Sequence, residues 1–290
     1  MLTVMIKFRV YVYLLIIALA SNTIFAKSSV WVVEKNGHSI IIAGSVHLVH
    51  PSQLPLPPEY LKAFAFSKRV VFEIDLSEMN QGTSLAKMIQ TFKLKGTTLD
   101  KTLRPEVWQE LNVVMKQYRV PHSLLAYDAA FMSFSLPLII WQNQGYREGI
   151  DKLLYDKAKQ ENKEIIGLET FDEQLKALAI LQEIDPNLLM QETLREITNP
   201  QFSLDALIKD LYQGQQTVLN EQLAIYNTKE MEPFYQVLLV SRNKAWIPKI
   251  DQFAKDSVKT MVIVGAMHLA GNDSVLQLLK AQGYKIRYYE

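Results

Sequence analysis

The 290-residue sequence contains no cysteine, which excludes several kinds of site at once. A chain without cysteine has no disulfide bond, no thiolate-held zinc or iron–sulfur site and no thiol nucleophile. It also lacks an excess of either charge, because 31 Lys and Arg residues stand against 30 Asp and Glu residues. This balance gives no reason to expect nucleic acid as a partner. With 49% apolar residues, the chain is expected to fold around a substantial core.

The sequence also lacks an apolar run long enough to cross a bilayer as a helix. The run at residues 10–20 follows Lys7 and Arg9 and falls short of the ~20 residues that such a helix needs. A basic start, a short apolar core and Ala26 before Lys27 are typical of a secretory signal peptide. We therefore expect residues 1–26 to be removed near Ala26, leaving a periplasmic or secreted protein. The alternative is an uncleaved anchor, with the membrane contacted only through this segment.

The hydrophobic pattern predicts a mixed α/β fold. Runs rich in β-branched and aromatic residues indicate strands. The turn residues Asn36 and Gly37 join the first two runs and favour a tight hairpin. Because strands and helices alternate at both ends of the chain, we expect a mostly parallel central sheet with flanking helices. The predicted strands cover residues 29–33, 39–43, 69–75, 164–168, 260–264 and 284–289.

Helical periodicity dominates the middle of the sequence. A helix after Pro58 carries Leu61, Phe64 and Ala65 at positions i, i+3 and i+4, which predicts one apolar face. Residues of about 80–160 and 171–255 indicate a large helical insertion into a single domain that spans residues 27–290. The second tract is expected to break at its prolines, Pro186, Pro200, Pro233 and Pro248.

One short motif occurs twice, each time directly after a predicted strand. Residues 44–48 read Gly-Ser-Val-His-Leu and residues 265–269 read Gly-Ala-Met-His-Leu. Glu73 lies late in another strand, and Glu169 follows a fourth. Ligands of open α/β sheets bind at the carboxyl ends of the strands. The two imidazoles and two carboxylates would therefore converge if these strands are neighbours.

Such a set suits a divalent metal with nitrogen and oxygen ligands. Each residue also has a structural interpretation. A histidine at a strand end is often simply hydrogen-bonded, and a glutamate in an apolar strand can pair with Arg147 or Arg242. Recurrence of the motif in the same context favours a shared site over two unrelated structural residues.

Several further motifs accompany these residues in order along the chain. They are Pro55-Leu56-Pro57, Val70 to Asp75, Gly149-Ile150-Asp151, Gly167-Leu168-Glu169-Thr170, Glu173-Gln174, Arg242-Asn243 and Val264 to Leu269. With the first Gly-x-x-His motif, they resemble the TraB/GumN family, which is related to the TIKI metalloproteases and to the erythromycin esterase/ChaN-like superfamily. The resemblance runs from about Trp31 to the C-terminus. It implies a mixed α/β fold with both histidines and the glutamate in one site, and metal-dependent peptide hydrolysis supported by manganese or cobalt.

Three hypotheses follow. The first is an exported metal-dependent hydrolase that acts on a peptide or another small substrate. In it His47, Glu73 and His268 hold Mn, Co or Zn, while Glu169 is a second ligand or general base. The second is a hydrolase without metal, in which His47 and Glu73 activate water. The third is a binding or exopolysaccharide-associated accessory protein that uses the same crevice without turnover.

The remaining candidates have supporting roles. Arg242 and Asn243 are expected to orient substrate, since a guanidinium suits a carboxylate and an amide can bond a peptide carbonyl. Asp151 is a candidate for fixing an imidazole tautomer, or alternatively for capping a helix.

Overall fold

The structure is a computed structural model that describes residues 27–79, 81–200, 203–225 and 228–290. The predicted signal peptide at residues 1–26 lies outside the described residues. Within the described ranges, no helix is long and apolar enough to cross a membrane.

A six-stranded sheet forms the centre of the fold, and it confirms the predicted fold class. The strand order of the main sheet is β6 (Glu164–Gly167), β4 (Arg69–Phe72), β7 (Thr260–Gly265), β2 (His38–Ser45), β1 (Val30–Lys35) and β8 (Lys285–Tyr288). In this order, the three pairs formed by the first four strands are parallel, and the last two pairs are antiparallel. A small second sheet joins β3 (Leu48–Val49) to β5 (Arg147–Glu148).

The predicted hairpin joins β1 to β2. Lys35 lies opposite His38, so Asn36 and Gly37 make the turn. Both turn residues have positive φ angles, 52° and 81°, as a two-residue hairpin turn of this type requires. The Asn-Gly pair is confirmed as the hairpin turn.

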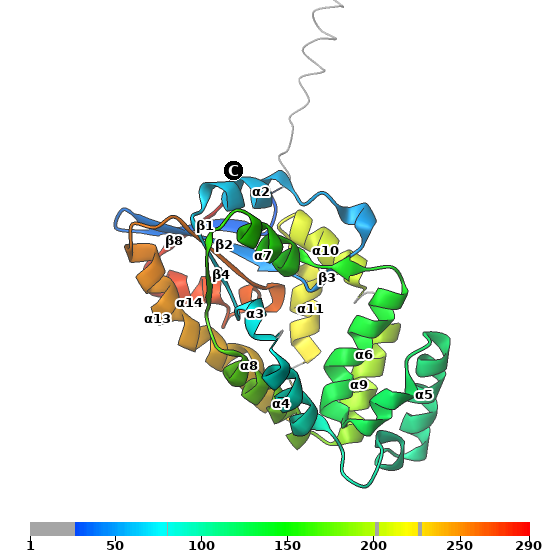
Figure 1. Ribbon diagram of the computed structural model, residues 1–290. Coiled ribbons are helices and arrows are strands. Elements are labelled where there is room, and N and C mark those ends of the chain that lie inside the picture. The colour runs from blue at the N-terminus through cyan, green and yellow to red at the C-terminus, as the bar shows by residue number, and fades with distance from the viewer. Residues whose placement is uncertain (1–26, 80, 201–202, 226–227) are drawn as a thin grey trace, which may run out of the picture.

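Helices cover both faces of the sheet and make a three-layer arrangement (Figure 1). Neighbouring strand residues alternate between the layers: Ile41 belongs to one apolar cluster, and Ile40 and Ile42 to the other. The first cluster includes α2 (Pro58–Phe66), α7 (Ile150–Gln160), α10 (Leu204–Tyr212) and α11 (Thr217–Ile225). The second includes α13 (Arg242–Lys255) and α14 (Val275–Ala281).

A third apolar cluster lies among the helices from the middle of the chain (Figure 1). Its helices are α4 (Gly82–Phe92), α5 (Pro105–Gln117), α6 (Ala129–Asn143), α8 (Phe171–Ala179), α9 (Pro186–Thr198) and α12 (Glu232–Tyr235). The short helix α3 (Leu76–Met79) and a π-helical turn at Gln236–Ser241 complete the main elements. Short 3-10 segments occur at Pro51–Gln53, Leu99–Lys101, His122–Ala126, Ile180–Glu183 and Ala266–Leu269.

The prolines act differently from one another. Pro186 is the first residue of α9 and Pro233 lies in the first turn of α12, as the sequence predicts. The prediction is wrong at Pro248, which lies inside α13 without ending it. Pro248 and Lys244 are both exposed, so water can satisfy the Lys244 carbonyl that the proline cannot bond.

Helix α2 is also turned differently from the prediction. Phe64 is buried as expected, but Leu61 and Ala65 are exposed, and Tyr60 and Ala63 fill the inner face instead. The Tyr60 hydroxyl donates a hydrogen bond to the Gly44 carbonyl at 2.7 Å, which holds this face against β2. The outer face of α2 is therefore apolar apart from Lys62.

Two residues of α5 provide a matched test of the third apolar cluster. Leu111 is fully buried, whereas Val113 is 62% exposed. Leu111→Ala should lower the free energy of unfolding by about 2–5 kcal/mol, because it removes buried methyl groups and leaves a cavity. Val113→Ala should change it by less than ~0.5 kcal/mol. Denaturant unfolding of both variants measures the difference, and equal effects would contradict this packing.

Candidate functional site

The four candidate side chains lie at the carboxyl ends of neighbouring strands. In the order of the sheet, Glu169 follows β6, Glu73 follows β4, His268 follows β7, and His47 follows β2. The condition for convergence is thus met, because these four strands are adjacent and parallel. The edge is the usual ligand-binding position of an open α/β sheet.

Arg242, at the start of α13, holds the centre of this edge. Its Nη2 donates to Glu73 Oε2 at 2.7 Å and to Glu169 Oε1 at 2.5 Å, and its Nε contacts both Glu169 oxygens at 3.1 Å. Its Nη1 donates to the Leu238 carbonyl at 3.0 Å and faces His268 Nε2 at 3.2 Å. Every N–H of the guanidinium therefore has an acceptor. We call Arg242, Glu73, Glu169 and His268 the Arg242 cluster.

The pKa values of the two carboxylates of the cluster are shifted in opposite directions. Burial raises the pKa of Glu73, but His268, Arg242 and the backbone N–H of Gly265 lower it more, so that it falls to about 2. Burial raises the pKa of Glu169 above its usual value, and Arg242 offsets this only in part. Glu73 is thus firmly ionised, whereas the charge of Glu169 depends on its contact with Arg242.

His268 is buried and neutral. Burial lowers its pKa to about 4, against the attraction of Glu73. Its Nδ1 lies 2.6 Å from Asn243 Oδ1, and Asn243 Nδ2 donates to the Asp273 carbonyl at 2.8 Å. Because the Asn243 oxygen is an acceptor, Nδ1 carries the proton and Nε2 presents its lone pair to Arg242. Asn243 is itself buried, and both the oxygen and the nitrogen of its side-chain amide are hydrogen-bonded.

His47 is the accessible histidine of the site, with 67% of its side chain exposed. Its Nδ1 donates to Asp151 Oδ2 at 2.7 Å, which confirms the tautomer-fixing contact expected of Asp151. The carboxylate raises the pKa of His47 from 6.5 to about 9, and nearby Glu73 contributes to the same direction. The other carboxylate oxygen, Asp151 Oδ1, is buried and accepts no hydrogen bond from the described residues.

Two glycines beside the site, Gly149 and Gly265, allow these close contacts. A Cβ at Gly149 would lie 1.9 Å from the Val46 carbonyl oxygen, so only glycine lets the start of α7 bring Asp151 beside His47. A Cβ at Gly265 would lie 3.0 Å from Glu73 Oε1, which accepts the Gly265 N–H at 2.7 Å. Both glycines are thus explained by close approach of the backbone.

Two residues of the site were not predicted as such. Trp246 Nε1 donates to Glu169 Oε2 at 3.2 Å, and its ring lies 4.9 Å from the Arg242 guanidinium and 4.5 Å from the His268 ring. Gln174 Nε2 donates to Glu73 Oε2 at 3.3 Å. Trp246 lies four residues after Arg242, a spacing that places both on one helix face and could have indicated the contact.

The arrangement does not provide a ready ligand set for a metal ion. Among the residues that the structure describes, no group of three His, Asp or Glu side chains is placed to hold one. The Arg242 guanidinium lies between Glu73, Glu169 and His268, and it uses the lone pair of His268 Nε2. His47 turns its Nδ1 to Asp151 instead. The proposed ligands His47, Glu73 and His268 do not fit a bound metal while Arg242 keeps this position.

Comparison with known proteins places the chain in a family. The sequence profile described as the TraB/PrgY/gumN family matches residues 29–288. The chain belongs to this family. It is similar to two proteins that carry the name "Uncharacterized protein YbaP", at 29% identity in Shigella flexneri and 28% in Escherichia coli (strain K12). Each match covers 250 residues, 84% of this chain and 89% of the relative. No solved structure matches the chain.

The His47–Asp151 contact can be tested by titration. Asp151→Asn should lower the pKa of His47 from about 9 towards 6.5, because the neutral amide no longer stabilises the imidazolium. NMR titration of the imidazole protons measures this change. Asp156→Asn, on the same helix but paired with Lys152, is the matched control and should leave the His47 titration unchanged. An unaltered midpoint in Asp151→Asn would contradict the contact.

Proposed function

We propose that this TraB/PrgY/gumN-family protein is a hydrolase that acts on peptides, with His47 as the group that activates water. The observation that carries the proposal is the division of the site. The Arg242 cluster is mostly buried and satisfied internally, whereas His47 is exposed and is oriented by Asp151. An exposed imidazole with a carboxylate on its other nitrogen is the arrangement of a general base.

The reaction would use Nε2 of His47, whose side chain is 67% exposed. In the neutral imidazole the proton on Nδ1 is held by Asp151, so that Nε2 can accept a proton from water. The water oxygen bonds to the carbonyl carbon of the substrate as this proton moves. The imidazolium then gives the proton to the leaving nitrogen while the C–N bond breaks. One water is consumed and His47 returns to its neutral form.

One oxygen of Asp151 has no donor in the described part of the chain. Its Oδ1 is buried beside His47, although buried acceptors normally have a hydrogen-bond partner. Because this oxygen is closed to solvent, an enclosed water molecule is a suitable donor and would hold the carboxylate in place against His47.

Arg242 and Asn243 take supporting roles in this proposal. Arg242 has no unused donor, so its binding to a substrate carboxylate would require exchange of one of its present contacts. We assign to it the fixing of Glu73 and Glu169. Asn243 fixes the tautomer of His268 rather than bonding a substrate carbonyl directly.

Metal-dependent hydrolysis is the second candidate, and one observation favours it. His268 is neutral, with its proton fixed on Nδ1 by Asn243, and this is the usual state of a metal-bound imidazole. Glu73 is ionised and near it, with Oε1 at 3.7 Å from His268 Nε2. Binding of Mn, Co or Zn by these residues and His47 would require the Arg242 side chain to leave.

A peptide-library assay tests the role of His47. His47→Gln should lower kcat/KM by about 10²–10⁴, because general-base catalysis contributes on that order. His38→Gln, in the exposed hairpin, is the matched control and should retain full activity.

In the wild type the rate of hydrolysis should rise with pH through the pKa of His47, since only the neutral imidazole accepts a proton. Asp151→Asn should move this rise to lower pH and reduce the plateau.

Metal analysis separates the two candidates. If His47 acts without metal, dialysis against a chelator leaves kcat/KM unchanged, and Arg242→Gln does not create a metal requirement. A stoichiometric metal in the active protein, lost in His268→Ala together with activity, would establish the metal-dependent alternative. No hydrolysis by the wild type under either condition would reject both.

The proposal includes export, for which the support is the sequence of residues 1–26. In a Gram-negative host the protein should be found in the periplasm with Lys27 as its first residue, as read by N-terminal sequencing. Leu15→Arg interrupts the apolar run and should leave the chain unprocessed. The matched control also introduces an arginine, but at an exposed position so that the core is not disturbed. Val113→Arg is such a change, and it should leave processing intact. A wild-type chain that keeps residues 1–26 in the membrane would support the anchor instead.

A further inference from the structure

The outer face of α2 is apolar apart from Lys62, although it is open to solvent. Its exposed side chains are Pro58, Leu61, Lys62, Ala65 and Phe66, spaced at i, i+3, i+4, i+7 and i+8. Leu61 is 39% exposed and Phe66 is 52% exposed. This spacing places them on a single stripe of the helix. We call these five side chains the α2 face, and α2 lies at the upper edge of the molecule in Figure 1.

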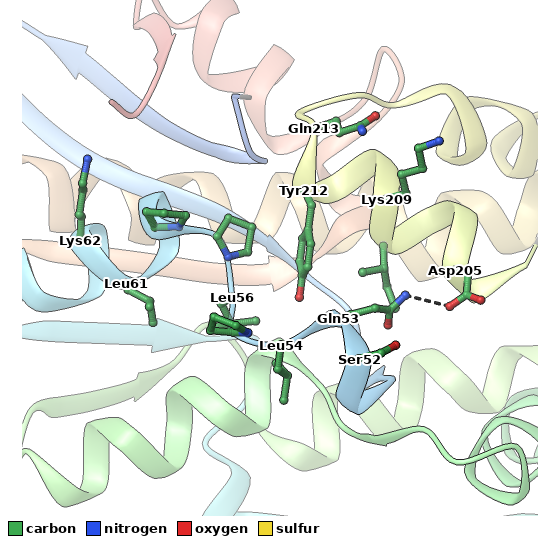
Figure 2. Close-up of a pocket in the computed structure, with 14 residues that line it drawn as sticks. Ser52, Gln53, Leu54, Leu56, Leu61, Lys62, Asp205, Lys209, Tyr212 and Gln213 are labelled. Atoms are coloured by element: carbon green, nitrogen blue, oxygen red, sulfur yellow. Dashed lines mark hydrogen bonds between the residues drawn. The ribbon is translucent and has the colours of Figure 1, made fainter. Parts of the chain in front are cut away.

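A groove continues the apolar surface beyond the start of α2. It lies between the Ser52–Leu56 segment, α2 and α10, and has a volume of about 760 Å³ (Figure 2). Leu54, 40% exposed, and Ile208 line it, together with the ring of Tyr212. The Tyr212 hydroxyl is buried and has no hydrogen-bond partner among the described residues. Three of the six large exposed apolar residues of the described chain, Leu54, Leu61 and Phe66, thus gather on one side.

Lysines border this apolar surface. Lys62 and Lys209 lie on opposite sides of the groove in Figure 2. Lys259, at the other end of α2, lies 5.5 Å from the centre of the Phe66 ring. The carboxylate in the groove, Asp205, accepts hydrogen bonds from Gln53 and Tyr146 at 2.8 and 2.6 Å. The carboxylate of α2 itself, Glu59, is buried on the inner side.

The described chain begins beside the same groove. The Ser29 N–H donates to the Leu211 carbonyl at 2.8 Å, directly before Tyr212. The Lys27 carbonyl lies against Gly214, next to the groove residue Gln213. Lys27, the first residue that the structure describes, therefore lies on this side of the fold.

We propose that the α2 face and the groove beside it form a docking surface for a membrane that contains anionic lipids. Exposed leucine and phenylalanine side chains with bordering lysines match the interface of such a membrane, where apolar groups enter the acyl boundary and ammonium groups meet phosphates. A second copy of the chain would instead oppose lysine to lysine. The contact between the α2 face and the membrane is separate from the proposed hydrolysis. It does not require residues 1–26 to be retained.

The absence of cysteine makes a direct test possible. Ala65→Cys in the full chain gives one thiol on the α2 face while Leu61 and Phe66 stay intact, and a nitroxide attached there reports its surroundings. With vesicles of phosphatidylglycerol and phosphatidylcholine, the label should lose access to a water-soluble nickel reagent and gain access to oxygen. Val113→Cys, on the exposed side of α5, is the matched control and should show neither change.

Further variants test each part of the docking surface. Leu61→Gln with Phe66→Gln should abolish the change at position 65. Lys62→Gln with Lys209→Gln should lower the partition coefficient of the protein between vesicles and water about 25-fold. This corresponds to about fivefold per lysine near an anionic surface. Three results would overturn the proposal: an unchanged label, an equal change at position 113, or an equal change with vesicles of phosphatidylcholine alone. A concentration-dependent change without vesicles would assign the face to a second copy of the chain.

Discussion

The bidentate pairing of Arg242 with Glu169, and its third contact with Glu73, is the interaction on which the site depends. Two carboxylates at the ends of adjacent strands would repel each other if no cation lay between them. The guanidinium satisfies both, and it is held in turn by the Leu238 carbonyl and the Trp246 ring. Loss of either partner of such a buried pair leaves a charge without compensation. The cluster is therefore a single unit rather than a set of independent residues.

The π-helical turn before α13 contributes to this placement. It spans Gln236–Ser241, and Arg242 is the first residue after it. Such turns are rare, occur mostly within longer helices and are frequent at functional sites. From this position Arg242 reaches the strand ends, while Asn243 and Trp246 contact His268 from the same helix. One helix end thus supplies three of the side chains that surround the buried imidazole.

Much of the fold was predictable from the sequence, because its signals are local. The strand runs, the Asn36-Gly37 turn and the Gly-x-x-His motifs each depend on neighbouring residues. The rotation of α2 was not predictable, since Leu61 and Tyr60 both belong to plausible apolar faces and a hydrogen bond to Gly44 decides between them. The pairing of glutamates with Arg242 was foreseen only as an alternative to metal binding. Sequence spacing does not reveal which cation lies between two carboxylates.

The long sequence separations within the site have a consequence for folding. His47 and Asp151 are 104 positions apart, and Arg242 is 169 positions from Glu73. Contacts of this range form only after the entropy of closing long loops has been overcome. Helices such as α5 or α9 can therefore form while the His47 imidazole still lacks its contact with the Asp151 carboxylate. Helical content and the His47–Asp151 contact therefore report different stages of folding. Only the contact shows that the distant parts of the chain have come together.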